Sequence, residues 1–438
     1  MRGQEAAGVA IDRRPGTAVE AQAGTAALAA WCLYDWANSA FPTVITTFVF
    51  SAYFTGYVAS DTVTGTALWG QMLSILGISV ALASPPLGAI ADQGGRRKPW
   101  LAAFSALCVL GTAALWFVRP DPADVVFALV VAGLASFAFE LASVFYNAML
   151  PDLVPNDRLG RLSGWGWGLG YAGGLACLMA SLLLLVQPEQ PPFGLDKEAA
   201  EHVRAVSLLV ALWFTVFALP LFLLTPDRPR SAVPLRAAVR GGLAVFARTL
   251  RQIPRYRNVA TFLLAKMIYI DGLNTLFAFG GIYAVGTFGM TFEEVLIFGI
   301  LLNVTAGLGA AGFAWVDDWI GAKPTVVISL VALTVLGGAV LFVEGKPAFY
   351  ALALGIGVFL GPTQAASRSL MARLAPPDLR TEFFGLYAFA GRATSFLGPA
   401  VLGWATYAFA SQRAGMATIL PFFMIGLLVL LFVKEPRH

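Results

Sequence analysis

The sequence predicts an all-α membrane protein with twelve transmembrane helices in two pseudo-symmetric six-helix halves. Its 438 residues are 58% hydrophobic and 12% charged, which leaves too little charge to cover the surface of a soluble protein of this size. Apolar runs long enough to cross a bilayer, about 20 residues each, recur along the whole chain. Polar motifs of the first half reappear in the second half in the same order.

Residues 1–26 are interpreted as a disordered cytoplasmic tail without a cleaved signal peptide, because no short apolar core with a cleavage site follows the basic start. The half 27–224 then holds six spans, the polar segment 225–257 separates the halves, and 258–438 holds the other six. The expected spans are 27–57, 65–91, 99–118, 125–150, 162–186, 205–224, 258–285, 295–316, 324–343, 348–374, 383–410 and 416–433.

Basic residues gather in the loops on the side of the N-terminus, including eight arginines from Arg228 to Arg257. The positive-inside rule therefore places both termini in the cytoplasm. The abundance of Arg and Ala suggests a bacterium, so the expected location is its plasma (inner) membrane. Within the central segment, Leu235, Val239, Leu243, Phe246 and Leu250 recur at three- and four-residue steps. This spacing predicts a basic amphipathic helix on the inner membrane surface, and the alternative is an ordinary linker.

The first span contains a carboxylate and an amide, Asp35 and Asn38, which share one face of a helix at this spacing. The seventh span repeats them as Asp271 and Asn274, and both copies fit D-x-x-N-[S/T]-x-F. An ionisable group at membrane depth is costly, and a polar motif repeated in two halves indicates a binding site between them. The alternative is that these side chains only cap or brace a helix.

Two further repeats support equivalent halves. Residues 153–157, between the fourth and fifth spans, are echoed by 374–378 between the tenth and eleventh. Likewise 92–97 is echoed by 318–323, and both follow the second span of their half. Three echoes in the same order indicate two six-span halves that alternate access to a site at the midplane.

The loop from Gly88 to Lys98 resembles the signature loop G-x-x-x-D-(R/K)-x-G-(R/K)-(R/K) of the major facilitator superfamily, with Gln93 in place of its first basic residue. Segments 34–41, 145–151, 364–370 and 382–387 are similar to the branch that includes the autophagy-related vacuolar amino-acid effluxers. The resemblance implies the major facilitator fold and secondary export of neutral amino acids or related small solutes. It also implies a gating loop formed by Gly88, Asp92, Gly95, Arg96, Arg97, Asp318, Gly321 and Lys323, in which Asp92 contacts the end of the eleventh span and nearby arginines and locks the outward-facing state.

Charged side chains within the spans supply candidate binding groups. A guanidinium can hold a carboxylate by two parallel hydrogen bonds, so Arg368 is the candidate anchor for an anionic solute group, with Arg392 as the second candidate. Asp35 or Asp271 would face an ammonium group. The alternative role for Arg368 is that of a gate only. Glu140 and Asp35 would bind and release coupling protons, unless Glu140 forms a static salt bridge. The predicted solute and proton site comprises Asp35, Trp36, Asn38, Glu140, Tyr146, Asn147, Asp271, Asn274, Gln364, Arg368 and Arg392.

Other classes of function lack support in the sequence. Cys32, Cys108 and Cys177 lie in apolar spans and match no metal spacing, and the only histidines are His202 and His438. No catalytic set, nucleotide-binding loop, cofactor, metal or nucleic-acid signal is present, so we expect a non-enzymatic transporter that acts as a monomer on a small solute, with protons. The alternatives are a cation-coupled sugar symporter and a non-transporting receptor or lipid-handling protein.

Overall fold

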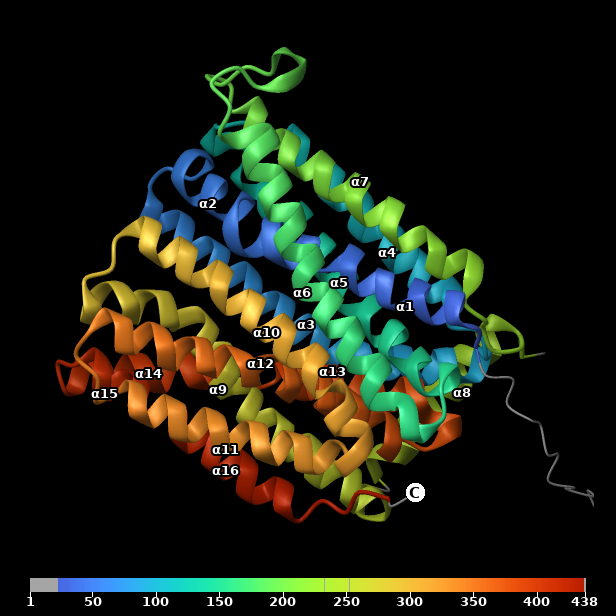
Figure 1. The fold of residues 1–438 in the computed structure, drawn as a ribbon. Helices are drawn as coiled ribbons and strands as arrows, with labels where there is room; N and C mark the ends of the chain where they lie inside the picture. Colours follow the sequence, from blue (N-terminus) through green and yellow to red (C-terminus); the bar gives the residue numbers. More distant parts are fainter. Residues whose placement is uncertain (1–22, 232, 252, 437–438) are drawn as a thin grey trace, which may run out of the picture.

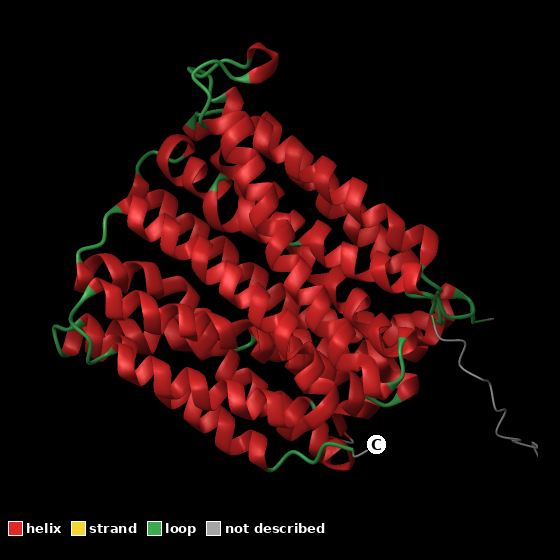
Figure 2. Ribbon diagram, viewed as in Figure 1, coloured by secondary structure: helices red, strands yellow, loops and turns green. Residues whose placement is uncertain are grey.

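The computed structural model describes residues 23–231, 233–251 and 253–436, so most of the expected tail 1–26 lies outside the described part. Figure 2 shows that the described chain consists of helices joined by loops, and this part of the chain contains no strand. Eleven of its helices are long and apolar enough to cross a membrane. The remaining expected span is also helical but is divided into two pieces, as described below.

The helices form two groups that face each other (Figure 1). The first group contains α1 (Thr25–Asn38) with its continuation to Val58, α3 (Thr62–Gly94), α4 (Lys98–Ala114), α5 (Val125–Leu153), α6 (Leu159–Ser181) and α7 (Glu201–Leu224). The second contains α9 (Arg257–Phe288), α10 (Phe292–Ile320), α11 (Ala322–Val340), α12 (Lys346–Leu374), α13 (Arg380–Arg392), α14 (Leu397–Ala408), α15 (Gln412–Ala417) and α16 (Ile419–Leu431). The two groups meet along two seams, α3 against α13 and α6 against α10, and α12 also packs on α6.

The first span changes its winding halfway along. After α1, residues Phe41–Phe48 form a π-helix, which is followed by α2 (Phe50–Tyr53) and a second π-helical turn, Phe54–Val58. The hydroxyl groups of Thr46 and Thr47 both donate to the Pro42 carbonyl at 2.8 Å. They thereby provide hydrogen bonds to a backbone carbonyl at the start of the π-helix. Irregular winding of this kind often marks a functional part of a helix.

The eleventh span is broken, whereas the apolar pattern predicted one continuous span over 383–410. α13 ends at Arg392, residues 393–396 form turns, and α14 starts at Leu397. Side chains satisfy backbone groups at the break: the Ser395 hydroxyl donates to the Arg392 carbonyl at 3.0 Å. Hydropathy cannot locate such a break, because the turn residues are themselves small or apolar.

Helix α8 (Leu235–Arg251) occupies the central segment and packs on the end of α3. A Cβ atom at Gly242 would lie 2.6 Å from the Ile90 Cα, so the two helix backbones touch there. Both described ends of the chain lie near this region: the Ala23 amide donates to the Leu153 carbonyl, and Asn258 is hydrogen-bonded to Lys434. We call this side of the bundle the α8 end (Figure 1).

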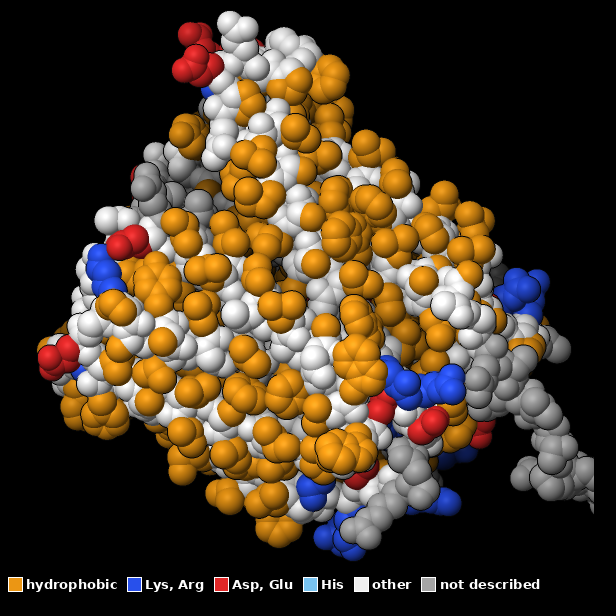
Figure 3. All heavy atoms as spheres, viewed as in Figure 1, with side chains coloured by type: hydrophobic (Ala, Val, Ile, Leu, Met, Phe, Trp, Pro, Cys, Tyr) orange, Lys and Arg blue, Asp and Glu red, His pale blue; other side chains and the backbone are white. Residues whose placement is uncertain are grey.

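The flank of the bundle is apolar, as a bilayer requires. Figure 3 shows hydrophobic side chains covering the visible flank between charged groups near its two ends. Large apolar side chains are widely exposed on it, for example Leu82 and Leu223, each at 71%. In water such a surface would be unfavourable by about 25 cal/mol per Å² of apolar area, whereas lipid tails cover it without that cost. The protein is an integral membrane protein.

Candidate functional site

Arg368 of α12 lies at the centre of a buried polar cluster and contacts the opposite half. Its Nη1 lies 2.9 Å from the Asp35 Oδ2 and 3.3 Å from the Asn147 Oδ1. Its Nε and Nη2 donate to the side chain and the carbonyl of Ser163, at 2.9 and 2.7 Å. Because Arg368 is only 2% exposed, this charge-assisted network compensates the removal of its charge from water.

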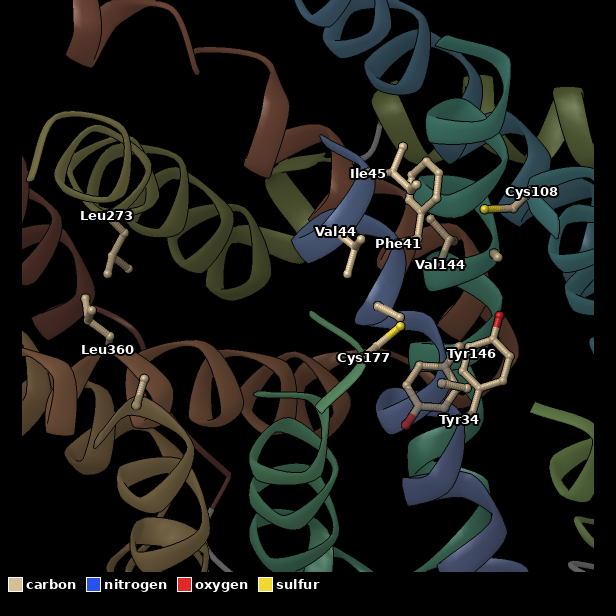
Figure 4. Close-up of a cluster of buried hydrophobic side chains, with 14 of the residues drawn as sticks. Tyr34, Phe41, Val44, Ile45, Cys108, Val144, Tyr146, Cys177, Leu273 and Leu360 are labelled. Atoms are coloured by element: carbon tan, nitrogen blue, oxygen red, sulfur yellow. The ribbon is translucent and has the colours of Figure 1, made fainter. Parts of the chain in front are cut away.

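Aromatic rings surround the same guanidinium. Its central carbon lies 4.9 Å from the ring centre of Trp31, 5.6 Å from that of Trp167 and 5.8 Å from that of Tyr146. Tyr146 stacks on Trp31 and on Tyr34, and its hydroxyl donates to the Trp31 carbonyl at 2.9 Å. Figure 4 shows Tyr34 and Tyr146 lying together between α1 and α5. The structure thus brings the predicted residues Asp35, Tyr146, Asn147 and Arg368 into one cluster.

Two predicted residues of the first span lie elsewhere. Trp36 stacks on Trp213 of α7 with ring centres 5.7 Å apart, and it does not face the guanidinium. One residue along a helix turns the side chain by about 100°, so the neighbour of Asp35 points into the packing within its own half. Asn38 is 5% exposed, and its side-chain oxygen accepts from the Ser39 hydroxyl at 3.4 Å. Gln364, one turn from Arg368, donates to the Tyr171 hydroxyl at 2.8 Å.

Glu140 and Arg392 form a second ion pair across the halves, in which Nη2 of Arg392 contacts Oε1 of Glu140. Next to it, Lys266 of α9 lies over the Tyr387 ring, 3.7 Å from its centre, and donates to the Tyr387 carbonyl at 2.9 Å. Glu140 was expected either to carry a coupling proton or to form a static salt bridge, and this geometry is that of the salt bridge. Lys266 satisfies its charge through an aromatic face and a carbonyl instead of through Asp271.

The second copy of the first-span motif does not join the first. Asp271 is 1% exposed, and a Cβ atom at Gly398 of α14 would lie 3.0 Å from its carbonyl oxygen. A Cβ at the next residue, Gly272, would meet Phe422 and Phe423 of α16. Asn274 is half-buried and has no side-chain hydrogen bond within the described part of the chain. The first copy reaches Arg368 of the opposite half, whereas Asp271 is packed within its own half, so the repeat does not create one shared site.

At the α8 end, the α3–α13 seam is closed by Asp92. Its carboxylate accepts hydrogen bonds from the Thr381 hydroxyl at 2.5 Å and from the Glu382 amide at 2.9 Å. Arg97 lies 3.6 Å from Asp92, donates to Thr381 at 2.8 Å and contacts Asp152. Burial lowers the pKa of Arg97, and the Asp152 charge opposes that effect. Asp92 thus contacts the start of the eleventh span and one of the loop arginines.

The loop residues around Asp92 have distinct environments. A Cβ at Gly88 would lie 2.9 Å from the Glu382 Cα, so only glycine allows this approach of α3 and α13. Gly95 has φ +81°, a conformation that side chains rarely adopt. Arg96 is exposed. Gln93, which replaces the usual basic residue, faces α8. Its Oε1 lies 3.6 Å from the position that a Cβ atom at Gly241 would occupy.

The α6–α10 seam has a corresponding acidic cluster. Asp318 accepts from the Gly160 amide at 2.8 Å and pairs with Arg161 at 2.6 Å. Asp317 pairs with the buried Arg373 at 2.6 Å, and Arg373 also contacts Glu435 at 3.0 Å. Gly321 precedes α11, and the backbone amide of Lys323 donates to Glu435 at 2.9 Å. Asp318 therefore crosses between the halves, as Asp92 does at the other seam.

Sequence reasoning missed several of these groups, namely Asp152, Ser163, Asp317, Arg373, Arg380 and Thr381. Asp152 contacts Arg97 and Arg380, and it bonds Arg228 at 2.8 and 3.0 Å. One signal was available for Asp152 and Asp317, because each is an acidic residue where an apolar span ends. No local signal marks Ser163 or Thr381, since serine and threonine are ordinary residues in membrane helices.

A cavity of about 390 Å³ opens between the halves, away from the α8 end. Its wall includes Thr43 and Phe48 from the irregular part of the first span and Phe277, Phe298 and Leu360 from the second half. Leu360 and Arg368 are two helical turns apart on α12, so the cavity ends about 12 Å from the Arg368 cluster along the helix. The molecule is thus closed at the α8 end and hollow on the other side.

Comparison with known proteins adds three findings. A family model described as "Vacuole effluxer Atg22 like" matches residues 54–438. An uncharacterised MFS-type transporter of Bacillus subtilis, YxiO, is 29% identical over 92% of this chain and 94% of its own length. Autophagy-related protein 22 of Coccidioides immitis is 24% identical over 85% of this chain and 72% of its own.

Among solved structures, the proton:xylose symporter XylE superposes with a TM-score of 0.70 at 14% identity, covering 94% of this chain and 96% of that one. At this identity the likeness concerns the fold alone. It confirms the prediction of a twelve-helix major facilitator fold.

Proposed function

The chain belongs to the family of vacuole effluxers like Atg22 and is a transporter of the major facilitator type, not an enzyme; on this premise, we propose that it exports neutral amino acids or related small solutes, coupled to protons. The solute class comes from the resemblance of the first-, fourth-, tenth- and eleventh-span motifs. The direction follows the effluxer description of the family. The proposed site is the Arg368 cluster together with the apolar cavity beyond it.

The observation that carries this proposal is the set of partners of Arg368. Among the described residues, the hydrogen-bond partners of its side chain all belong to the opposite half; they are Asp35, Asn147 and Ser163. When the halves separate at the α8 end, Arg368 loses these partners and presents a free guanidinium. Asp35 becomes a free carboxylate at the same moment. An amino acid carries the complementary carboxylate and ammonium groups and can replace both partners.

The cavity supports a solute with an apolar portion. Its wall contains many aromatic and aliphatic side chains, and its few polar groups include Thr43, Thr47 and Asn303. A sugar needs hydrogen-bond partners around most of its surface, because an unpaired buried hydroxyl costs about 1–3 kcal/mol. An aliphatic or aromatic side chain needs none. Neutral amino acids with apolar side chains therefore fit this wall better than sugars.

The two closed seams support alternating access as the transport mechanism. If the α8 end faces the cytoplasm, as the distribution of arginines predicts, the closed seams describe an outward-facing state of a bacterial inner-membrane protein. Rotation of the halves would break the contacts of Asp92 and Asp318 and close the cavity. The solute would then load at Arg368 from the cytoplasm and leave through the cavity.

Flux in proteoliposomes tests the proposal. Labelled neutral amino acids would be offered to the reconstituted full-length protein under an imposed pH gradient, with Asp35→Asn as the variant. We expect gradient-dependent flux in the wild type and a loss of at least tenfold in Asp35→Asn. Flux of sugars instead of amino acids would contradict the proposed solute class. Absence of flux for every solute in a folded sample would favour a receptor or lipid-handling role.

A further inference from the structure

Three carboxylates lie inside the spans and away from their ends, namely Asp35, Glu140 and Asp271, and among the described residues only Asp271 of these three has no ion pair. Asp35 is paired with Arg368, and Glu140 is paired with Arg392. Asp271 has no ion pair within the described residues, and its buried Oδ1 has no hydrogen-bond partner there. An ionised carboxylate isolated in an apolar interior is costly by several kcal/mol, and such a group takes up a proton instead.

The elements packed on α9 around Asp271 explain this isolation. Neither α14 nor α16, which cover this part of α9, contains a charged residue. Next to Asp271, Phe423 of α16 lies 2.9 Å from the Cβ position of Gly272. The acidic residues of α10 lie near its two ends, at 293–294 and 317–318. The surroundings of Asp271 therefore supply neither an opposite nor a like charge from these helices.

The nearest cations on the remaining neighbours are occupied. Lys266, on α9 itself, is held by the ring and carbonyl of Tyr387. Arg392 of α13 is held by Glu140. On α15, Arg413 donates to the carbonyls of Leu341 and Val343, both at 2.8 Å. On α12, Arg368 is held by the first half, and the Tyr269 hydroxyl of α9 is bonded to Ser367 at 2.6 Å.

The break of the eleventh span lies against the same stretch of α9. The Thr394 hydroxyl donates to the Met267 carbonyl at 3.3 Å, one turn of α9 before Asp271. Gly398, at the start of α14, is in contact with Thr275 and with the Asp271 carbonyl. Interrupted membrane helices are where transporters bind coupling ions, because their free backbone groups and local flexibility admit an ion or water.

We propose that Asp271, at the break between α13 and α14, is the group that carries the coupling proton of this transporter. This inference rests on the proposed transport function and deepens it. In the state described here Asp271 is the neutral acid: one Oδ has accepted a proton from a hydronium ion, which leaves a water molecule. The cavity starts on α9 at Leu276, five residues further along. In this proposal the proton reaches Asp271 from that open side. When the halves rotate, displacement of the break re-solvates the carboxyl group, and the O–H bond gives its proton to water.

Infrared spectroscopy and transport together test the proposal on the reconstituted full-length protein. The carbonyl band of a protonated carboxylic acid should be present in the wild type, weaker in Asp271→Asn and unchanged in Asp35→Asn. In Asp271→Asn, accumulation driven by a proton gradient should fall at least tenfold, while exchange of internal for external solute should fall less than threefold. Asp271→Glu should shift the band and retain part of the accumulation, which guards against a folding defect of the asparagine variant.

Several outcomes would overturn the inference. An acid band that is identical in the wild type and Asp271→Asn would show that Asp271 is ionised. Equal losses of exchange and accumulation would assign it to solute binding or structure, and accumulation driven by a sodium gradient instead of protons would exclude proton coupling. If no amino acid moves in the wild type, the proposed function fails, and the infrared band still decides the protonation of Asp271.

Discussion

Arg368 and Asp35 are 333 residues apart in the chain and belong to opposite halves, yet their side chains meet at 2.9 Å in the buried centre of the molecule. The same Nη1 also donates to Asn147, and the other two nitrogens, Nε and Nη2, donate to Ser163. This use of a planar fork of donors distinguishes arginine from lysine, whose single ammonium group cannot reach all three partners in this geometry.

Replacement of Arg368 by lysine should therefore impair transport although the charge is kept. Loss of one or two hydrogen bonds to charged or buried groups amounts to about 1.5–3 kcal/mol, or about 10- to 100-fold in rate. Initial rates in proteoliposomes measure this loss, with the exposed Arg158→Lys as the matched control. Normal transport rates in Arg368→Lys would exclude a role for the several hydrogen bonds that the planar guanidinium donates.

Asp92→Asn should slow turnover more than it weakens solute binding. Asparagine keeps one acceptor for Thr381 or Glu382 but loses the second carboxylate oxygen and the charge opposite Arg97. The closed α8 end is thereby destabilised while the Arg368 cluster is untouched. Binding of labelled solute should change less than twofold and the flux should fall several-fold, whereas Asp157→Asn, in an exposed loop, should change neither. An equal loss of binding would contradict a gating role.

Arg373→Ala should lower the thermal stability of the protein far more than Arg161→Ala. The side chain of Arg373 is 1% exposed, and its removal leaves Asp317 as a buried, unpaired carboxylate, which costs about 3–5 kcal/mol. Arg161 is 44% exposed, and such a pair contributes at most about 1 kcal/mol. Thermal unfolding in detergent compares the two variants. Similar shifts of the melting temperature would mean that the Asp317 cluster relaxes or admits water.

Gly164→Val should open the α8 end without disrupting either half. Its Cβ would lie 2.5 Å from the Ala314 Cβ of α10, in the other half, so the clash is relieved when the halves separate. A cysteine placed at Ala365, which is 4% exposed, should then react faster with a water-soluble thiol reagent. Gly173→Val is the matched control. The new side chain would clash with the Trp36 backbone in the same half, so this variant should reduce the folding yield instead of opening the α8 end. Unchanged reactivity at position 365 would contradict the expected opening.

The sequence predicted the fold well because the bilayer imposes strong rules. Length and hydropathy located the spans, and the motif echoes identified two equivalent halves. The departures are local: the first span contains π-helical stretches, and the eleventh is broken at 393–396. Both depend on how side chains satisfy individual backbone groups, which a hydropathy pattern does not record.

The candidate site was predicted only in part. Asp35, Tyr146, Asn147 and Arg368 were identified because unusual polar side chains or family motifs marked them, and the structure places them together. Their partner Ser163 was missed because nothing in its local sequence distinguishes it. Pairing of charges across the halves, such as Glu140 with Arg392, depends on helix rotation and tilt, and one sequence does not fix either.

The Asp92 and Asp318 clusters close two different seams, on either side of the Arg368 cluster. A thermal fluctuation that ruptures one seam leaves the other intact, and the central guanidinium still bridges the halves. No continuous aqueous path then joins the two faces of the membrane, so such a fluctuation cannot dissipate the ion gradient. Under the proposed alternating access, the two seams together would protect the membrane potential from leakage, although each contact alone would break during a transport cycle.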